Sequence, residues 1–460
     1  MVSIATVREN NSAITGLYGS GLVAVFVGGT SGIGESTARA FIRSTQASRA
    51  YLIGRDQARA HQIIGELQQL NPDAQITFIR SDVSLLREVD EACRAIQQQE
   101  DKVNILFLSP GVGTMNGRDE IAAAFPHGIQ GKNIIVTGVS PNSLGLATAD
   151  AFASQSPANL ILTGRSSEKV EASITSLRSK YPNIQYHALI MDLASQSSVR
   201  AAAAKLNQDD SIPTIDILVN NAGVMAIQAL TLSEDGIETT FATNHLGHFL
   251  FTNLILAKII KAARTSSTPT RIINVSSFGH QFSPVRFSDI NFSKRPADLP
   301  ADERPDFEKT EFFTGSSHSE DTYYGFFSYA QSKTANILFS IALNQRLWAK
   351  YGIASFAVHP GAVGTNINRH ATPAEIEQAV KRVAELGLDA SSKTPEQGAN
   401  SSVLAAVDPG LSPVDDEVKG VYIADCRVDD ANVAGFAKNR HVAEKLWALS
   451  EGLVQQKFEI

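Results

Sequence analysis

A short apolar segment, a glycine-bearing turn and a helical segment follow one another twice in this 460-residue chain. The first occurrence covers residues 22–44 and the second covers residues 132–154. Three residue types recur at a single spacing of 110 positions, in the pairs Gly28 and Gly138, Arg55 and Arg165, and Asp82 and Asp192. Three anchors at one spacing predict a tandem duplication of one architecture.

Within each copy, apolar strand-like segments alternate with helical segments of 10 to 15 residues. The strands are expected at 22–27, 50–53, 76–80 and 103–108 in the first copy, and at 132–136, 159–163, 184–190 and 215–219 in the second. This alternation predicts an α/β fold with a Rossmann-type, doubly wound parallel sheet. The first copy stops after about four strands, whereas the second continues. We therefore predict a truncated half-domain at 1–120 and a complete domain at 121–460.

Composition limits the class of protein. The net charge of −7 and the 43% share of hydrophobic residues indicate a globular protein and argue against a nucleic-acid partner. The two cysteines, Cys93 and Cys426, are too few for a disulfide framework or a zinc site, and the histidines form no ligand-spaced cluster. We therefore expect no metal and a reducing, cytoplasmic compartment. No segment reaches the ~18 apolar residues of a membrane span, so none is expected.

The glycine turns suit a pyrophosphate, because glycine permits a sharp turn and the following helix presents free N–H groups. The first copy carries Gly28, Gly32 and Gly34, and the second carries Gly138, Asn142 and Gly145. The alternative interpretation is a tight structural turn without a ligand.

The second strand of each copy ends in Gly-Arg, at Arg55 and Arg165. A guanidinium at this position suits a 2′-phosphate, so Arg165 favours NADP(H) over NAD(H). The alternative is a solvated arginine at a strand end.

Tyr329 and Lys333 are four residues apart, which places them on one face of a helix that Gly352 is expected to end. A phenol has a pKa near 10, so acid/base work near pH 7 requires a pKa lowered by about 3 units, or about 4 kcal/mol. A neighbouring ammonium favours the phenolate and can supply much of that change. Alone, this spacing is common and carries little information.

Four further motifs accompany this pair. They are a strand ending in hydroxyls at 271–277, Asn220-Asn-Ala-Gly223 after a strand, Asn244-His-Leu-Gly247 in a helix, and Val358-His-Pro-Gly361 followed by Thr365. With these motifs the chain resembles the short-chain dehydrogenase/reductase family over almost its whole length, most specifically over residues 131–457. The nearer resemblance, carried by residues 244–250 and 358–361, is to the retinol-dehydrogenase and WW-domain-oxidoreductase branch.

The resemblance implies a nicotinamide cofactor and a catalytic set. Tyr329 would donate the proton to a carbonyl, or accept it from an alcohol; Lys333 would hold the nicotinamide ribose and lower the tyrosine pKa. Ser277 would bond the substrate oxygen, and Asn244 would organise a water in the proton relay. The positions implied for cofactor binding are Thr137, Gly138, Ser140, Asn142, Leu144, Gly145, Arg165, Asp192, Leu193, Asn220, Ala222, Gly223, Tyr329, Lys333, Pro360, Gly361, Val363 and Thr365.

Two departures from the family pattern stand out. Asn142 replaces a usual glycine, although asparagine tolerates positive φ better than most residues. An insert at about 281–325 occupies most of the 51 positions between Ser277 and Tyr329. Its aromatic residues are Phe282, Phe287, Phe292, Phe307, Phe312 and Phe313. We expect the insert either to border the substrate cleft, favouring a lipophilic substrate, or to be a surface excursion whose aromatics pack locally.

The first copy lacks a catalytic set. Its fourth strand is followed by Ser109-Pro-Gly111, Val27 stands where the second copy has Thr137, and no Tyr-x-x-x-Lys belongs to it. The residues of a second cofactor turn would be Gly28, Gly32, Gly34, Arg55 and Asp82. Truncation would also leave the outer edge of the fourth strand unpaired. The copy is therefore a cofactor or interaction module, a partner-dependent half-domain, or a vestige.

Together these features predict an NADP-preferring oxidoreductase that interconverts an alcohol and a ketone or aldehyde on a lipophilic small molecule. A catalytically silent cofactor-binding scaffold or regulator is the alternative. An epimerase or dehydratase shares the Tyr-x-x-x-Lys pattern but is less consistent with the other motifs. The sequence leaves the substrate, the direction and a homo-oligomeric state open.

Overall fold

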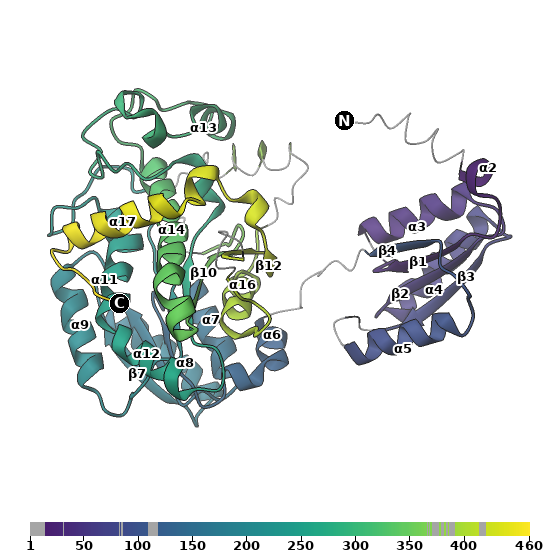
Figure 1. Cartoon of the computed structure of the whole chain (residues 1–460), viewed down its shortest axis with the longest axis horizontal. Coiled ribbons are helices and arrows are strands. Elements are labelled where there is room, and N and C mark those ends of the chain that lie inside the picture. Colours follow the sequence, from purple (N-terminus) through teal and green to yellow (C-terminus); the bar gives the residue numbers. More distant parts are fainter. Residues whose placement is uncertain are drawn as a thin grey trace. The chain divides into compact units, whose positions relative to one another are not determined.

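The computed structural model describes residues 14–30, 32–81, 83, 86–108, 118–365, 367, 369, 377–378, 381–382, 385, 392–413 and 420–460. Two residue sets named above, Asp82 and 109–111, lie outside these ranges. The chain divides into two compact units, Met1–Thr114 and Met115–Ile460 (Figure 1). Helix α6 (Arg118–Ala124), at the start of the second unit, packs against helices of that unit.

The first unit contains a four-stranded parallel sheet with the strand order β3-β2-β1-β4. Its strands are β1 (Val23–Val27), β2 (Arg49–Gly54), β3 (Gln75–Arg80) and β4 (Ile105–Leu108), and its helices are α2 (Ile14–Tyr18), α3 (Gly32–Ser44), α4 (Gln57–Leu70) and α5 (Leu86–Gln97). Strand β1 is buried along its whole length, as an uninterrupted apolar run predicts for a strand covered on both faces. Phe26 packs in the core on one face and Val25 in the core on the other.

The second unit contains an eight-stranded sheet with the order β12-β11-β10-β9-β8-β5-β6-β7, parallel except for the β11–β12 pair. Its strands are β5 (Asn133–Val136), β6 (Asn159–Gly164), β7 (Gln185–Ile190), β8 (Ile217–Asn220), β9 (Arg271–Val275), β10 (Ala354–His359), β11 (Tyr422–Ala424) and β12 (Arg427–Val428). Its other helices are α7 (Leu144–Ala153), α8 (Ser167–Lys180), α9 (Gln196–Gln208), α10 (Thr239–Phe241), a π-helical turn (Ala242–Leu246), α11 (Gly247–Leu254), α12 (Leu256–Thr265), α13 (Phe307–Thr314), α14 (Gly325–Tyr351), α16 (Pro395–Val407) and α17 (Arg440–Leu453).

Helices cover both faces of this sheet (Figure 1). One apolar core lies between the sheet and α7, α8 and α16, and the other lies between the sheet and α9, α11, α14 and α17. Helix α17 packs against α14, which ends at Gly352 in the left-handed conformation with φ 67°, as predicted. The doubly wound α/β fold expected from the sequence is confirmed.

The strand order determines which loops meet. Strands β10, β9, β8 and β5 are neighbours and run in one direction. Because the carboxyl ends of parallel strands lie at one edge of a sheet, the segments after them are brought together. These segments contain Thr137 after β5, Asn221 after β8, Ser277 after β9 and Pro360 after β10.

The truncated sheet of the first unit has an open edge. Strand β4 ends the sheet, and no described strand pairs with its outer side. Its side chains Leu106 and Leu108 are 61% and 65% exposed. The matching strand β8 of the second unit is buried and paired on both sides. Among the described residues β4 is therefore an edge strand, the position in which the truncation places it.

The insert after β9 belongs to the second unit. It begins in the 3₁₀ helix Phe278–Phe282 and contains α13. Arg286 is fully buried, pairs with Asp289 and lies 4.0 Å from the centre of the Phe292 ring. The insert therefore contributes its own charged and aromatic interior.

Among the described residues, no single helix is long and apolar enough to cross a membrane, although the bent pair Thr239–Leu254 and Leu256–Thr265 passes that test when taken together. The same residues contain no group of three or more His, Cys, Asp or Glu side chains arranged to hold a metal ion.

Candidate active site

Tyr329 and Lys333 lie one turn apart on α14, and both are buried, at 6% and 2% exposure. The Lys333 ammonium donates to the Val275 carbonyl at 2.9 Å and lies 5.4 Å from the centre of the Tyr329 ring. Because Val275 is the last residue of β9, this bond fixes α14 to the carboxyl edge of the sheet.

Burial controls the protonation of this pair. It raises the pKa of the Tyr329 phenol to about 12, against the opposing effect of a hydrogen bond with Ser277, and it lowers the pKa of the Lys333 ammonium to about 7. The sequence leads us to expect a tyrosine pKa lowered by the neighbouring lysine. In the structure the direction is the opposite, because desolvation outweighs the opposing effect of Ser277 on the phenol.

Ser277 follows β9 and begins the 3₁₀ helix Phe278–Phe282. Its hydroxyl accepts a hydrogen bond from the Gly279 amide at 3.1 Å, and it is near enough to the Tyr329 phenol to lower the pKa of that group. A β-carbon at Gly279 would lie 3.0 Å from a Tyr329 ring carbon and 3.5 Å from the Ser277 Oγ. The turn therefore rests directly on the phenol ring.

Asn244 lies in the π-helical turn before α11 and is fully buried. Its amide donates to the Val224 carbonyl and to the Ser332 hydroxyl, both at 2.9 Å, and its oxygen accepts from the Val224 amide at 2.8 Å. The side chain thus joins the loop after β8 to α14. Both of its N–H groups are used within the protein.

The turn after β5 is tightly packed. The Thr137 hydroxyl oxygen accepts from the amides of Asn221 and Ala222 at 2.9 and 3.0 Å and lies 2.9 Å from His248 Nε2. A β-carbon at Gly138, where φ is 73°, would lie 2.6 Å from the Ala222 Cα. The close approach between these two loops therefore requires glycine.

The rest of this turn leads into α7. Asn142 has φ 59°, the left-handed conformation that the sequence predicts asparagine to tolerate. Ser143 caps α7 by accepting from the Leu146 amide at 3.0 Å, and it also accepts from the Ser140 amide at 3.1 Å. Leu144 is the first helical residue. A β-carbon at Gly145 would lie 2.7 Å from the Gly138 carbonyl oxygen.

The remaining predicted cofactor residues fall into two groups. Asn220 points into the sheet, where its amide donates to Thr252 and Asn274, so the neighbouring Asn221 is the residue at the turn. Asp192 accepts from the Ala194 amide at 3.0 Å. The others lie at or near strand ends, with Arg165 exposed after β6, Leu193 buried against Gly247, Gly223 after β8, and Pro360, Gly361, Val363 and Thr365 after β10.

The first unit repeats the backbone of the turn. Gly28 has φ 79°, and a β-carbon at Gly34 would lie 2.2 Å from the Gly28 carbonyl oxygen, which matches the Gly138–Gly145 approach. Gly32 begins α3, and Arg55 follows β2 and is exposed. Val27 at the Thr137 position lacks the hydroxyl that holds two amides in the second unit.

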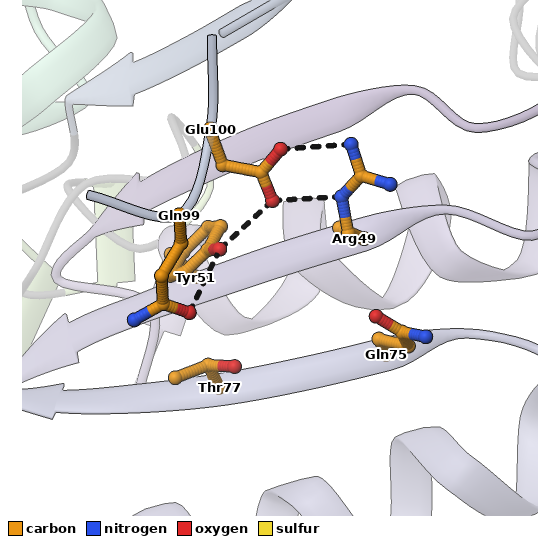
Figure 2. Close-up of a pocket in the computed structure, with 6 residues that line it drawn as sticks. All are labelled: Arg49, Tyr51, Gln75, Thr77, Gln99 and Glu100. Atoms are coloured by element: carbon orange, nitrogen blue, oxygen red, sulfur yellow. Dashed lines mark hydrogen bonds and ion pairs between the residues drawn. The ribbon is translucent and has the colours of Figure 1, made fainter. Parts of the chain in front are cut away.

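A polar hollow of about 290 Å³ in the first unit is lined by Arg49, Tyr51, Gln75, Thr77, Gln99 and Glu100 (Figure 2). Both Arg49–Glu100 contacts measure 2.7 Å, and the Tyr51 hydroxyl donates to Glu100 at 2.8 Å. The Arg49 guanidinium lowers the pKa of Glu100. Arg49 and Gln75 begin their strands, so the hollow lies at the opposite end of the sheet from the glycine turn. We interpret these bonds as a structural link between β2 and the end of α5.

A family model described as short chain dehydrogenase matches residues 22–124 and 132–288. The chain belongs to the short-chain dehydrogenase family. Both copies match the one model, which agrees with the predicted duplication.

Individual relatives extend this result. The oxidoreductase fscI of Fusarium equiseti is 41% identical over 249 residues, which are 54% of this chain and 93% of the relative. Retinol dehydrogenase 13 of Homo sapiens is 35% identical over 328 residues, 71% of this chain and 85% of the relative. A solved structure of an uncharacterized protein from Mycobacterium paratuberculosis is 26% identical with a TM-score of 0.50 and covers 74% of this chain and 98% of its own. This short-chain dehydrogenase is therefore an oxidoreductase homologous to retinol dehydrogenases.

Sequence reasoning missed several residues that shape the site. Asn221 and His248 lie inside the motifs at 220–223 and 244–250, but the motifs alone assign no role to either, and Gly279 lies in no motif. The importance of all three arises from contacts made in the fold. Membership of these two motifs is the signal that could have drawn attention to Asn221 and His248.

Proposed function

We propose that the second unit of this short-chain dehydrogenase interconverts an alcohol and a ketone or aldehyde, with NADP(H) as cofactor and Tyr329 as general acid/base. The observation that carries the proposal is the arrangement of Tyr329 and Lys333, buried one turn apart on α14, beside the turn that carries Ser277. A β-carbon at Gly279 in that turn would lie 3.0 Å from the Tyr329 ring and 3.5 Å from the Ser277 Oγ. The similarity to retinol dehydrogenases supports a place in that branch of the family.

The turn after β5 fits a dinucleotide. The backbone at Gly138 and Gly145 leaves no room for a β-carbon, and the N-terminus of α7 presents amides suited to a pyrophosphate. A β-carbon at Gly223 would lie 3.2 Å from Asn244 Oδ1 and 3.6 Å from Lys333 Nζ. Gly223 therefore lies next to the side chain of Lys333. A bound nicotinamide supplies or accepts the hydride, and the protein provides position and proton transfer.

The side chains divide the proton chemistry among themselves. In the direction that forms the alcohol, Tyr329 donates its phenolic proton to the carbonyl oxygen as that oxygen gains negative charge. In the direction that forms the carbonyl compound, the Tyr329 phenolate accepts the proton of the substrate hydroxyl. The Ser277 hydroxyl donates a hydrogen bond to the same oxygen. The positive charge of Lys333 favours the phenolate over the phenol.

Aromatic side chains next to these groups favour a lipophilic substrate. Phe278 follows Ser277 directly, and its ring lies 6.0 Å from that of Phe313 on α13. The centre of the Phe326 ring lies 5.0 Å from that of Phe282 and 6.4 Å from that of Tyr329. Half-buried rings beside a reacting group provide apolar surface for a substrate. This arrangement supports the interpretation in which the insert borders the substrate cleft.

Two arginines, Arg165 after β6 and Arg369 after β10, favour the phosphorylated cofactor. Arg165 directly follows β6, and burial together with the charge of Arg165 lowers the pKa of the Arg369 guanidinium. Two guanidinium groups that influence each other suit a dianionic 2′-phosphate better than a neutral ribose hydroxyl.

Steady-state kinetics with NADPH and NADH over a panel of lipophilic aldehydes and ketones test this function. We expect turnover with NADPH, and loss of nearly all turnover in Tyr329→Phe with NADPH binding retained. Full activity of Tyr329→Phe would contradict the mechanism.

The alternative is a cofactor-binding scaffold without turnover, which the additional half-domain favours. NADPH binding without turnover, for every member of the panel in both directions, would support the scaffold and contradict the proposed enzyme.

A further inference from the structure

His280 is a fully buried histidine that the proposed mechanism does not use. It lies in the 3₁₀ helix that begins at Ser277, three positions after that residue. The Ser277 carbonyl accepts two hydrogen bonds from it, one from the His280 backbone amide at 3.1 Å and one from ring Nδ1 at 2.7 Å. The imidazole therefore holds the residue proposed to bond the substrate oxygen.

The hydrogen bond at Nε2, the second ring nitrogen of His280, indicates which nitrogen carries the hydrogen. The Ala434 amide donates to His280 Nε2 at 3.3 Å, so Nε2 carries the lone pair and Nδ1 carries the hydrogen. Burial lowers the pKa of His280 to about 4, which agrees with a neutral ring. A neutral ring with this one tautomer satisfies both partners at once.

His280 also connects the Ser277 turn to α14. The Thr334 hydroxyl, next to Lys333 in the sequence, bonds to the His280 carbonyl at 3.0 Å and to the Ser283 carbonyl at 2.7 Å. The other side of the ring faces Tyr422 of β11, with 5.2 Å between ring centres. Three separate segments therefore meet at this one residue.

The position of this turn determines the Ser277–Tyr329 geometry. Gly279, one residue before His280, lies so close to the Tyr329 ring that a β-carbon there would be 3.0 Å from a ring carbon. A small displacement of the turn would move the Ser277 hydroxyl relative to the phenol, and displacements of about 1 Å cost about 100-fold in rate.

We propose that His280 is a positioning residue, whose neutral imidazole holds the Ser277 turn between the Tyr329 helix and the segment at Ala434. The inference rests on the proposed function, because Ser277 receives its role there. The Nδ1 bond to Ser277 is the essential contact, and the Nε2 bond to Ala434 orients the ring.

Two amide variants separate the contacts. In His280→Asn the amide nitrogen can occupy the place of Nδ1 and donate to Ser277, whereas in His280→Gln the longer side chain reaches toward Ala434 and loses that donor. We expect His280→Gln and His280→Ala to lose about 10- to 100-fold in kcat, and His280→Asn to stay within about threefold of the original protein. The KM for NADPH should not change. His187→Gln, which removes a half-buried histidine on β7, is the matched control and should keep full kcat.

Hydrogen–deuterium exchange of the peptide 277–283 gives a readout without turnover. We expect faster exchange in His280→Gln than in His280→Asn, since only the latter keeps the bond to Ser277. Three results would each overturn the positioning role. The first is a kcat of His280→Gln equal to that of the original protein, and the second is an equal loss of kcat in all three variants in proportion to their lost thermal stability. The third is unchanged exchange of the peptide 277–283. An original protein that binds NADPH but turns over no substrate contradicts the proposed function instead, and the exchange measurement still decides whether His280 holds the turn.

Discussion

Gly279 lies against Tyr329 so closely that a β-carbon at position 279 would be 3.0 Å from ring carbon Cε1 and 3.3 Å from Cδ1. Both groups belong to rigid surroundings, because the ring projects from the buried helix α14 and the turn is held at Ser277 and His280. The absence of a side chain at 279 therefore allows the Ser277 turn to lie this close to the phenol ring.

Gly279→Ala should lower kcat by about 10- to 100-fold, because either the phenol or the turn must move by several tenths of an ångström. The KM for NADPH should change little, since the variant leaves the β5 turn intact. Steady-state kinetics measure both. Gly452→Ala, where nothing lies within 4 Å of the added carbon, is the control. Equal kcat in Gly279→Ala and the control would show that the contact has no role in catalysis.

Lys333 should make the stability of the ligand-free protein depend on pH. Burial lowers its pKa from 10.5 to about 7. Between these values the unfolded chain binds a proton that the folded protein lacks, so the free energy of unfolding rises with pH across this window. Lys333→Met removes that dependence, and the Val275 carbonyl keeps a hydrogen bond from Asn336 at 3.0 Å.

We therefore expect Lys333→Met to be inactive but more stable than the original protein at pH 7, with a smaller advantage near about pH 9.5. Urea unfolding without cofactor at the two pH values, followed by tryptophan fluorescence, measures the difference. A variant that is less stable by the same amount at both pH values would contradict the expected deprotonation.

Arg165 should discriminate between the two nicotinamide cofactors. Loss of charge-assisted bonds to a 2′-phosphate costs about 1.5–3 kcal/mol, or about 10- to 100-fold in affinity. Arg165→Ala should raise the Kd for NADPH by that factor and leave the Kd for NADH unchanged, as measured by fluorescence titration. The duplication provides the control, because Arg55→Ala changes the matching position of the first unit. A loss of NADPH affinity in Arg55→Ala instead would place the cofactor in the first unit.

Local sequence patterns predicted the elements and part of the site. Apolar runs identified the strands of the first unit and β5 to β9 of the second, although not β11 and β12. The spacing of Tyr329 and Lys333 placed them one turn apart on a helix, as observed. Asn142 adopts the positive φ expected of it. These features depend on neighbouring residues in the chain, so periodicity and turn chemistry are sufficient to predict them.

Contacts between distant segments could not be predicted in this way. The Thr137–His248 contact joins residues 111 positions apart, and the Ala434–His280 bond joins residues 154 positions apart. The raised pKa of Tyr329 also escaped prediction, because it depends on how completely the fold excludes water from the phenol. Contacts and pKa values of this kind depend on how distant segments pack together. Local patterns in a single sequence do not reveal that packing.

The open edge of β4 should make the first unit prone to association. Leu106 and Leu108 project from a strand that no described strand covers on its outer side, and an exposed apolar edge is a template for pairing with other chains. Replacing both residues by lysine adds charges to the edge and should reduce light scattering during heating or refolding. Since both side chains are exposed, the free energy of unfolding should stay within about 0.5 kcal/mol.

The matched control is Leu230→Lys with Leu232→Lys in the second unit, where the two leucines are 41% and 53% exposed but do not belong to a strand of the sheet. An equal reduction of scattering in both double variants would attribute the effect to added charge in general. A reduction confined to the β4 variant would attribute it to the edge left open where the first copy ends, because the same strand in the second unit is covered by β9.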